Sequence, residues 1–348
     1  MRRKTRKIYY GSLAVGGDAP ISVQSMTNTK TTDLEKTINQ IQELSEVGCE
    51  IIRVAVPDMN SAKKLSKLSK SIDIPLIADI HFDYRLALEA IKQGVDGLRL
   101  NPGNIGQADR VKEIVLQAKD AGVPIRIGIN SGSIEKEILY KYGRPTAEGM
   151  VESALKHIKI LEQNNFEEIV ISLKSTDIMM TIKAYQLMAE RVDYPLHIGI
   201  TEAGTLWSGT IKSSVGIGSL LAQGLGDTIR ISLTGDPIEE VKVGWQILKA
   251  LRLRKKGPEI ISCPTCGRTE INLIKLAEEV EKRFTNLKKD ITIAVMGCAV
   301  NGPGEAREAD IGIAGGKGEG LIFKKGELIK KVPEDQLLKE LEYEIDKI

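Results

Sequence analysis

One unit repeats along most of the chain: a short apolar run rich in Ile and Val, a polar turn, and a longer segment with helical periodicity. Strands that are buried on both faces read as continuous apolar runs, and parallel strands need helical crossovers between them. Eight such units within about 250 residues predict an α/β fold, a closed (β/α)8 TIM barrel. The predicted strands span residues 21–26, 49–56, 75–80, 97–101, 124–130, 168–174, 195–201 and 228–233.

An open, doubly wound sheet is the alternative architecture for such a repeat. The glycine pattern that binds dinucleotides in that fold, G-x-G-x-x-G after a strand, is not found: Gly216-Ile217-Gly218 comes closest, with Leu221 where the third glycine belongs. The phosphate-loop pattern fails too, because Gly316-Lys317 is followed by Gly318. The closed barrel is therefore the favoured interpretation.

A second domain follows the repeat. A helical pattern over residues 237–253 ends in a basic stretch and then Gly257-Pro258, where we place a domain boundary. Beyond it come a cysteine loop, a helix over residues 269–284, a strand over 291–296, a glycine-rich loop, short strands and a final helix. We predict a substrate-binding barrel over residues 1–256 and a small α+β domain over residues 257–348.

The bulk composition excludes several classes of protein. With 49 basic and 47 acidic side chains, the formal charge of +2 gives no support for binding to nucleic acid. No apolar run is long enough to cross a membrane, and the basic residues 2–7 lack the apolar stretch of an export signal, so we expect a solvated basic arm. Four cysteines are too few for a disulfide scaffold and fit a reducing cytoplasm.

Isolated charges lie near the C-terminal ends of the predicted strands, which form the active-site face of a barrel. Each buried ion costs several kcal/mol unless it is compensated, and five cations against two carboxylates leave an excess that a bound polyanion would balance. These charged residues are Arg53, Asp79, Arg99, Arg126, Lys174, Glu202 and Arg230. Polar residues that share a strand face with four of them, by the two-residue alternation of strands, are His81, Asn101, Asn130 and Ser232.

The excess of arginines indicates what the polyanion is. Arginine forks match phosphate oxygens two at a time, so a diphosphate is the best-fitting small ligand. Glu202 stands apart as a carboxylate beside this cationic set, and we interpret it as a general acid or proton carrier, with a structural ion pair as the alternative.

The cysteines of the second domain indicate redox chemistry. Cys263 and Cys266 form a Cys-x-x-Cys turn, which zinc sites also use, but a structural zinc site closes with four Cys or His ligands. After Cys298 the chain has no further Cys and no His. Three thiolates favour an iron-sulfur cluster in which one iron is open to substrate or takes an oxygen ligand. Glu305, seven residues after Cys298, is the candidate oxygen ligand.

Three segments carry a family resemblance. The runs Ser-Cys-Pro-Thr-Cys-Gly-Arg at 262–268, Met-Gly-Cys-Ala-Val-Asn-Gly-Pro-Gly-Glu at 296–305 and Gln-Ser-Met-Thr at 24–27 resemble the 4-hydroxy-3-methylbut-2-enyl diphosphate synthase family, in its short bacterial form. That resemblance implies reductive ring opening and dehydration of 2-C-methyl-D-erythritol 2,4-cyclodiphosphate to (E)-4-hydroxy-3-methylbut-2-enyl diphosphate, a step of non-mevalonate isoprenoid (terpenoid) biosynthesis.

The resemblance also implies roles for individual residues. A 4Fe-4S cluster would be held by Cys263, Cys266, Cys298 and Glu305. Catalysis would involve Glu202, Glu305 and, near the cluster and substrate, Asn301. The residues that would hold the diphosphate are Arg53, Arg99, Arg126, Lys174, Arg230 and Ser232, to which the strand pattern adds Asp79, His81 and Asn130 as substrate-binding candidates.

The partners follow from the same resemblance. Electrons would come singly from ferredoxin or flavodoxin, in keeping with the missing dinucleotide pattern. The chain would form a homodimer in which the cysteine domain of one subunit closes over the barrel of the other. Two other functions stay open: a non-redox barrel enzyme acting on a phosphate ester with a zinc knuckle for partner binding, and a cluster that only relays electrons or senses oxygen.

Overall fold

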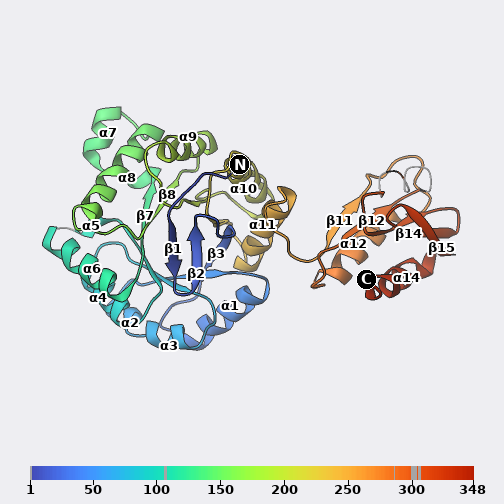
Figure 1. Cartoon of the computed structure of the whole chain (residues 1–348), viewed down its shortest axis with the longest axis horizontal. Coiled ribbons are helices and arrows are strands. Elements are labelled where there is room, and N and C mark those ends of the chain that lie inside the picture. Colours follow the sequence, from blue (N-terminus) through green and yellow to red (C-terminus); the bar gives the residue numbers. More distant parts are fainter. Residues whose placement is uncertain (1, 106–107, 286, 299–303, 305–306) are drawn as a thin grey trace. The chain divides into compact units, whose positions relative to one another are not determined.

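Two compact units make up the chain, and they divide between Arg254 and Lys255. The computed structural model describes residues 2–105, 108–285, 287–298, 304 and 307–348 (Figure 1). Each unit has its own apolar core and its own sheet.

The first unit is the predicted barrel. Its eight parallel strands are hydrogen-bonded in the order β8-β7-β6-β5-β4-β3-β10-β9, and a bridge between Ile171 of β8 and Leu196, just ahead of β9, joins the two ends of the sheet. All eight predicted strands are present, although β9 and β10 are short. They are β3 (Ser22–Met26), β4 (Ile51–Ala55), β5 (Leu76–Asp79), β6 (Gly97–Leu100), β7 (Ile125–Asn130), β8 (Ile169–Lys174), β9 (His197–Ile198) and β10 (Thr228–Ile229).

Helices follow each barrel strand and surround the sheet (Figure 1). Five of them begin at an aspartate whose carboxylate accepts a hydrogen bond from a backbone N–H of the first turn, an N-cap that fixes where the helix starts. These five are α1 (Leu34–Glu46), α2 (Met59–Ala62), α4 (Tyr84–Lys92), α9 (Ile178–Ala189) and α11 (Pro237–Ala250). The others are α3 (Leu65–Lys70), α5 (Pro102–Ile105), α6 (Ala108–Ala121), α7 (Lys136–Tyr142), α8 (Ala147–Glu162) and α10 (Leu206–Ala222), with a short 3-10 turn, η1 (Ser131–Ser133).

An N-terminal hairpin covers one end of the barrel. Its antiparallel strands are β1 (Lys7–Tyr10) and β2 (Leu13–Gly16). The side chains of Ile8, Tyr10 and Val15 are buried. They form an apolar cluster with residues near the starts of three barrel strands, namely Ile51, Ile77 and Val170. Because these strand starts lie opposite the active-site face, the hairpin closes the N-terminal end of the barrel.

The expectation of a solvated N-terminal arm is wrong. Arg2 forms an ion pair of 2.6 Å with Asp227, a buried carboxylate beside β10. Arg3 donates to the backbone carbonyl of Tyr194 at 3.2 Å. The arm is held because burying Asp227 requires a compensating cation, and that cation lies far away in the sequence.

The second unit is a small α+β domain, as predicted. A five-stranded sheet has the order β11-β12-β13-β14-β15, in which β11, β12 and β13 run parallel and the last two strands are antiparallel. The strands are β11 (Glu259–Ser262), β12 (Thr292–Met296), β13 (Ile311–Gly315), β14 (Glu319–Lys324) and β15 (Glu327–Pro333). The helices are α12 (Leu273–Phe284), the short η2 (Glu334–Gln336) and α14 (Leu337–Asp346).

Candidate active site

The barrel strands bring the predicted cations together, although Arg126 is the second residue of β7 and so lies near the start of its strand rather than at the C-terminal end. Arg53, Arg99, Arg126 and Lys174 come from β4, β6, β7 and β8. Arg126 is 1% exposed, Lys174 7% and Arg99 8%, so these charges are enclosed by the barrel. We call them, together with Arg230 just after β10, the cation cluster.

Asp79 at the end of β5 is the central carboxylate of the cation cluster. Its oxygens lie 3.6 Å from Nε of Arg53 and 3.4 Å from Nη1 of Arg99. Burial by itself would raise the pKa of this carboxyl group, but Arg53, His81 and Arg99 outweigh that effect and lower it. Asp79 therefore stays ionised and offsets one of the five positive charges.

Arg126 crosses the barrel interior. Its Nη1 donates to Oε1 of Gln24 on β3 at 2.5 Å. Among the described residues, its buried Nε and the buried Nε2 of Gln24 have no hydrogen-bond partner. Burial lowers the pKa of Arg126 to about 10, and the charges of Arg99 and Arg230 act in the same direction. A bound anion would accept hydrogen bonds from these unpaired N–H groups and would reduce the repulsion between Arg126 and its positively charged neighbours.

Lys174 and His197 lie beside each other on β8 and β9. The Lys174 Nζ is 3.4 Å from Nε2 of His197, and burial followed by the neighbouring arginines lowers the pKa of Lys174 well below its usual range. A Cβ at Gly199 would lie 3.0 Å from Nζ and 2.5 Å from the carbonyl oxygen of Arg230. Only glycine at position 199 leaves room for this lysine.

Arg99 needs a glycine in the same way. Its Nη2 donates to the carbonyl oxygen of Gly128 at 3.0 Å, and a Cβ at Gly128 would lie 2.7 Å from Nε of Arg99. The N–H of Gly128 donates to Oδ1 of Asn101 at 2.9 Å. Arg99 and Asn101, which sequence alternation placed on one face, therefore both contact the neighbouring strand β7.

The second carboxylate of the cation cluster is one that the sequence reading missed. We expected Glu202 to stand beside the cations, but the carboxylate nearest Arg230 belongs to Glu240 in the first turn of α11, with Oε2 3.9 Å from Nη2. Glu240 is 5% exposed. Its pKa is raised by burial, against which Arg230 and Lys174 act. The excess of three cations over carboxylates remains, since Glu240 takes the place that was assigned to Glu202.

Glu202 lies in the loop between β9 and α10 and is exposed. Its backbone is left-handed, with φ of 51°, a region that residues other than glycine seldom adopt. The loop is fixed to the loop after β10, where the N–H of Thr234 donates to the carbonyl oxygen of Gly204 at 2.9 Å. The carboxylate is thus carried on a constrained loop at the active-site end of the barrel.

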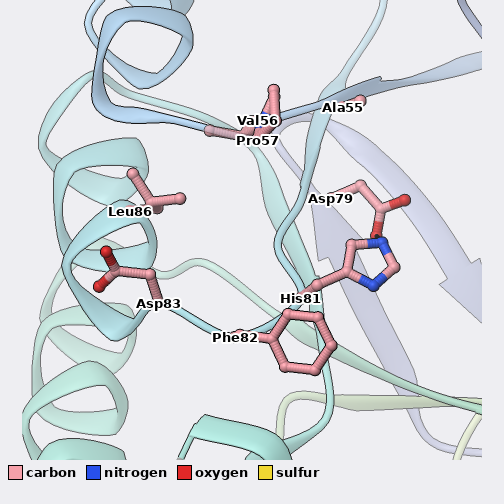
Figure 2. Close-up of a pocket in the computed structure, with 8 residues that line it drawn as sticks. All are labelled: Ala55, Val56, Pro57, Asp79, His81, Phe82, Asp83 and Leu86. Carbon is pink, nitrogen blue, oxygen red and sulfur yellow. Dashed lines mark ion pairs between the residues drawn. The ribbon is translucent and has the colours of Figure 1, made fainter.

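The remaining predicted residues of the barrel face lie around its mouth. Ser232 and Asn130 are half-buried, at the ends of β10 and β7. His81 follows β5 and is exposed, with Nε2 3.8 Å from Oδ1 of Asp79. A pocket of about 320 Å³ opens beside His81, and Figure 2 shows Asp79 and His81 at one side of it. Its other lining residues are Ala55, Val56, Pro57, Phe82, Asp83 and Leu86.

In the second unit, the cysteines follow neighbouring parallel strands. Ser262 of β11 is paired with Val295 of β12, so Cys263 and Cys298 both lie just beyond the C-terminal ends of these strands. Cys298 is buried, Cys263 is half-buried and Cys266 is exposed, and all three are free thiols. The fold thus brings two of the predicted ligands, Cys263 and Cys298, to one edge of the sheet.

Backbone groups around the thiols suit thiolate ligands. The N–H of Gly297 donates to Sγ of Cys263 at 3.2 Å, as amides do toward cluster-bound sulfur. The N–H of Arg268 lowers the pKa of the Cys266 thiol. Within the described ranges, no three His, Cys, Asp or Glu side chains are spaced to hold a metal ion. The predicted residues Asn301 and Glu305 lie outside the described residues.

Comparison with known proteins covers nearly the whole chain. The model of the GcpE TIM-barrel domain matches residues 5–245, and that of the GcpE protein C-terminal domain matches residues 259–347. A protein of Clostridium acetobutylicum named 4-hydroxy-3-methylbut-2-en-1-yl diphosphate synthase (flavodoxin) is 63% identical over 345 residues, 99% of each chain. A protein of the same name from Geobacter sulfurreducens is 61% identical over 348 residues, 100% of this chain and 99% of that one.

Solved structures resemble the barrel more distantly. The Yersinia pestis dihydropteroate synthase has a TM-score of 0.50 at 14% identity and covers 71% of this chain and 99% of that chain. This likeness supports the barrel fold alone. Over the parts of the chain that the structure describes, no helix is long and apolar enough to span a membrane.

Proposed function

The chain belongs to the GcpE family, and on that premise we propose that it binds 2-C-methyl-D-erythritol 2,4-cyclodiphosphate at the mouth of its barrel. It is a flavodoxin-dependent iron-sulfur oxidoreductase that converts this substrate to 4-hydroxy-3-methylbut-2-en-1-yl diphosphate in the non-mevalonate pathway. A non-redox barrel enzyme with a zinc knuckle is thereby excluded.

The cation cluster is the observation that supports a substrate site at the barrel. Five buried or half-buried cations face only Asp79 and Glu240, and the Nε atoms of Arg126 and Arg230 lack partners among the described residues. A diphosphate would supply both the missing charge and the missing acceptors. We assign its binding to Arg53, Arg99, Arg126, Lys174, Arg230 and Ser232, with Asp79, His81 and Asn130 holding the rest of the substrate and the cations in place.

The second unit is proposed to hold a 4Fe-4S cluster through Cys263, Cys266, Cys298 and Glu305. Two thiols just beyond neighbouring strands, those of Cys263 and Cys298, and an N–H directed at the sulfur of Cys263 support this donor set. When bound, the cluster supplies the substrate with electrons one at a time. Asn301 is assigned to the same place by its position between Cys298 and Glu305.

Glu202 is proposed to carry protons. Ring opening and dehydration take up two electrons and two protons and release one water, so a group at the mouth must protonate the departing oxygen. Glu202 is a carboxylate on a constrained loop at that end of the barrel. Glu202→Gln should keep the cluster absorption and the substrate affinity while turnover is lost, and undiminished turnover would remove Glu202 from the catalytic set.

Anaerobic purification tests the cluster directly. A brown protein with about four iron and four sulfide per chain is expected, and it should turn over the cyclodiphosphate with reduced flavodoxin. A colourless protein with one tightly bound zinc and no sulfide would overturn the assignment. Single-turnover assays with reduced flavodoxin and reduced ferredoxin, run side by side, show which donor is preferred, and we propose flavodoxin.

We further propose that the enzyme is a cytoplasmic homodimer. A reducing compartment keeps the three cluster thiols free of disulfides. Mixing a Glu202→Gln chain with a Cys266→Ser chain tests the dimer. Activity recovered on mixing would mean that a barrel and a cysteine domain from different chains act together, and sedimentation of a monomer would contradict the dimer.

A further inference from the structure

Glu240 is a buried carboxylate that the proposed reaction does not use. Its Oε1 accepts a hydrogen bond from the N–H of Leu233 at 2.8 Å. Its Oε2 lies 3.5 Å from Oγ of Ser25 on β3 and 3.9 Å from Nη2 of Arg230. One side chain on α11 thus contacts β3, the end of β10 and the loop that follows β10.

The neighbouring glutamate shows that this burial is specific. Glu239 forms an exposed ion pair of 2.7 Å with Lys242, an ordinary surface contact three residues along the helix. Glu240 instead points inward, where the charges facing it are Arg230 from β10 and Lys174 from β8. Burying a carboxylate costs several kcal/mol without such compensation. The side chain is therefore tied to the cation cluster.

The spacing leaves Arg230 able to bind a ligand. At 3.9 Å the carboxylate attracts the guanidinium without forming a hydrogen bond to it, and Nε of Arg230 has no partner among the described residues. The hydrogen bond to the N–H of Leu233 fixes the backbone next to Ser232. Both groups that Glu240 holds, Arg230 and Ser232, are ones assigned to the diphosphate.

We propose that Glu240 is a positioning residue for the substrate's diphosphate: it holds Arg230 and the backbone at Ser232 where they meet phosphate oxygens. This inference rests on the proposed function. It predicts an effect on substrate binding rather than on the chemical step, because Glu240 acts through residues that contact phosphate.

Glu240→Gln tests it, because glutamine keeps an oxygen for the Leu233 N–H and removes the charge. We expect the KM for the cyclodiphosphate and the dissociation constant of inorganic pyrophosphate to rise by about 5- to 20-fold, with kcat changed by less than about 2-fold. Glu239→Gln is the matched control and should change neither. A lowered melting temperature with an unchanged KM, or tighter binding of pyrophosphate, would overturn the inference.

Arg230→Gln separates this inference from the site on which it rests. If Glu240 acts through Arg230, adding Glu240→Gln to Arg230→Gln should weaken pyrophosphate binding no further. Additive losses would overturn the inference. If Arg230→Gln alone leaves pyrophosphate binding unchanged, the diphosphate assignment of Arg230 fails instead. If Glu240→Gln does not fold, Glu240→Asp is the second variant, because it keeps the charge but shortens the side chain by one methylene. Glu240→Asp should also raise the KM. An unchanged KM would overturn the inference.

Discussion

The cation cluster of the barrel and the cysteines of the second unit differ in what holds their side chains in place. The cation cluster stands on strands, is buried, and is held by partners such as Gln24, Asp79 and Gly128. The cysteines stand on loops beyond β11 and β12, and Cys266 is exposed. An anion site can be built entirely by folding, whereas a metal site on loops takes part of its order from the metal. The barrel should therefore keep its affinity for its anionic ligand when the second unit lacks the proposed cluster.

The largest effect is expected from Cys266→Ser. Turnover should fall to background and the cluster absorption should be lost, because one of the three proposed thiolate ligands is removed. Binding of pyrophosphate to the barrel should remain unchanged, as calorimetry can measure. The matched control is Cys49→Ser, because Cys49 is a free thiol buried in the barrel. Its Sγ lies 3.1 Å from the carbonyl oxygen of Ile51, and a serine hydroxyl could donate a hydrogen bond to the same oxygen. Loss of pyrophosphate binding in Cys266→Ser would break the comparison.

Arg126→Ala should give the opposite pattern. A charged hydrogen bond is worth about 1.5 to 3 kcal/mol, so the KM should rise roughly 10- to 100-fold while the cluster absorption stays intact. Steady-state kinetics and an absorption spectrum on one preparation check both halves. Arg191→Ala, an exposed arginine after α9, is the control. An unchanged KM would count against a diphosphate at this end of the barrel.

Raising the pH should weaken diphosphate binding through Lys174. Burial and then the neighbouring arginines lower the pKa of its amine in the free enzyme. A bound polyanion favours the protonated amine, so affinity is complete below that lowered pKa and falls as the pH rises through it. Dissociation constants of pyrophosphate for wild type and Lys174→Arg, compared from about pH 6 to 10, cancel the titration of pyrophosphate itself. A constant ratio between them would contradict the prediction.

The smallest change in free energy that we predict is one of stability, and it concerns the backbone of Glu202. At φ of 51° a glycine is relieved of strain, so Glu202→Gly should raise the free energy of unfolding by about 1 kcal/mol while abolishing turnover. Arg252, with φ of 54° in an exposed turn after α11, is the matched control: Arg252→Gly should gain similar stability and keep full activity. Denaturant titration measures both. Lower stability of Glu202→Gly would show that the side chain itself stabilises the loop.

The barrel strands were predictable because burial on both faces leaves a continuous apolar run for each strand. The hairpin was not predicted, since β1 and β2 are short and their partners, such as Val170, are distant in sequence. The prediction of a solvated basic arm was wrong for the same reason, because Asp227 comes close to Arg2 only in the folded chain. Local sequence patterns predict helices and strands, whereas the partner of a buried charge depends on tertiary contacts.

The cations of the site were predictable in the same way, because strand alternation fixes which residues share a face. Glu240 was not, since Glu239 and Glu240 both read as acidic residues that suit the first turn of a helix. Which of the two points inward is decided by how α11 packs against β3 and β10. The spacing of the cysteines predicted that the ligands of one cluster lie together. Strand pairing places two of them, Cys263 and Cys298, at the same edge of the second unit's sheet.

The N-terminal hairpin has a consequence for how the chain reaches its folded state. It precedes the barrel strands in the chain, yet Arg3 donates to the Tyr194 carbonyl across 191 residues and Arg2 pairs with Asp227 across 225 residues. The apolar cluster of Ile8, Tyr10 and Val15 is complete only when Val170 of β8 has joined Ile51 and Ile77 against it. Contacts of such long sequence separation slow folding and expose the nascent chain to aggregation. Because its contacts span so much of the chain, we expect the hairpin to dock late in the folding of the barrel.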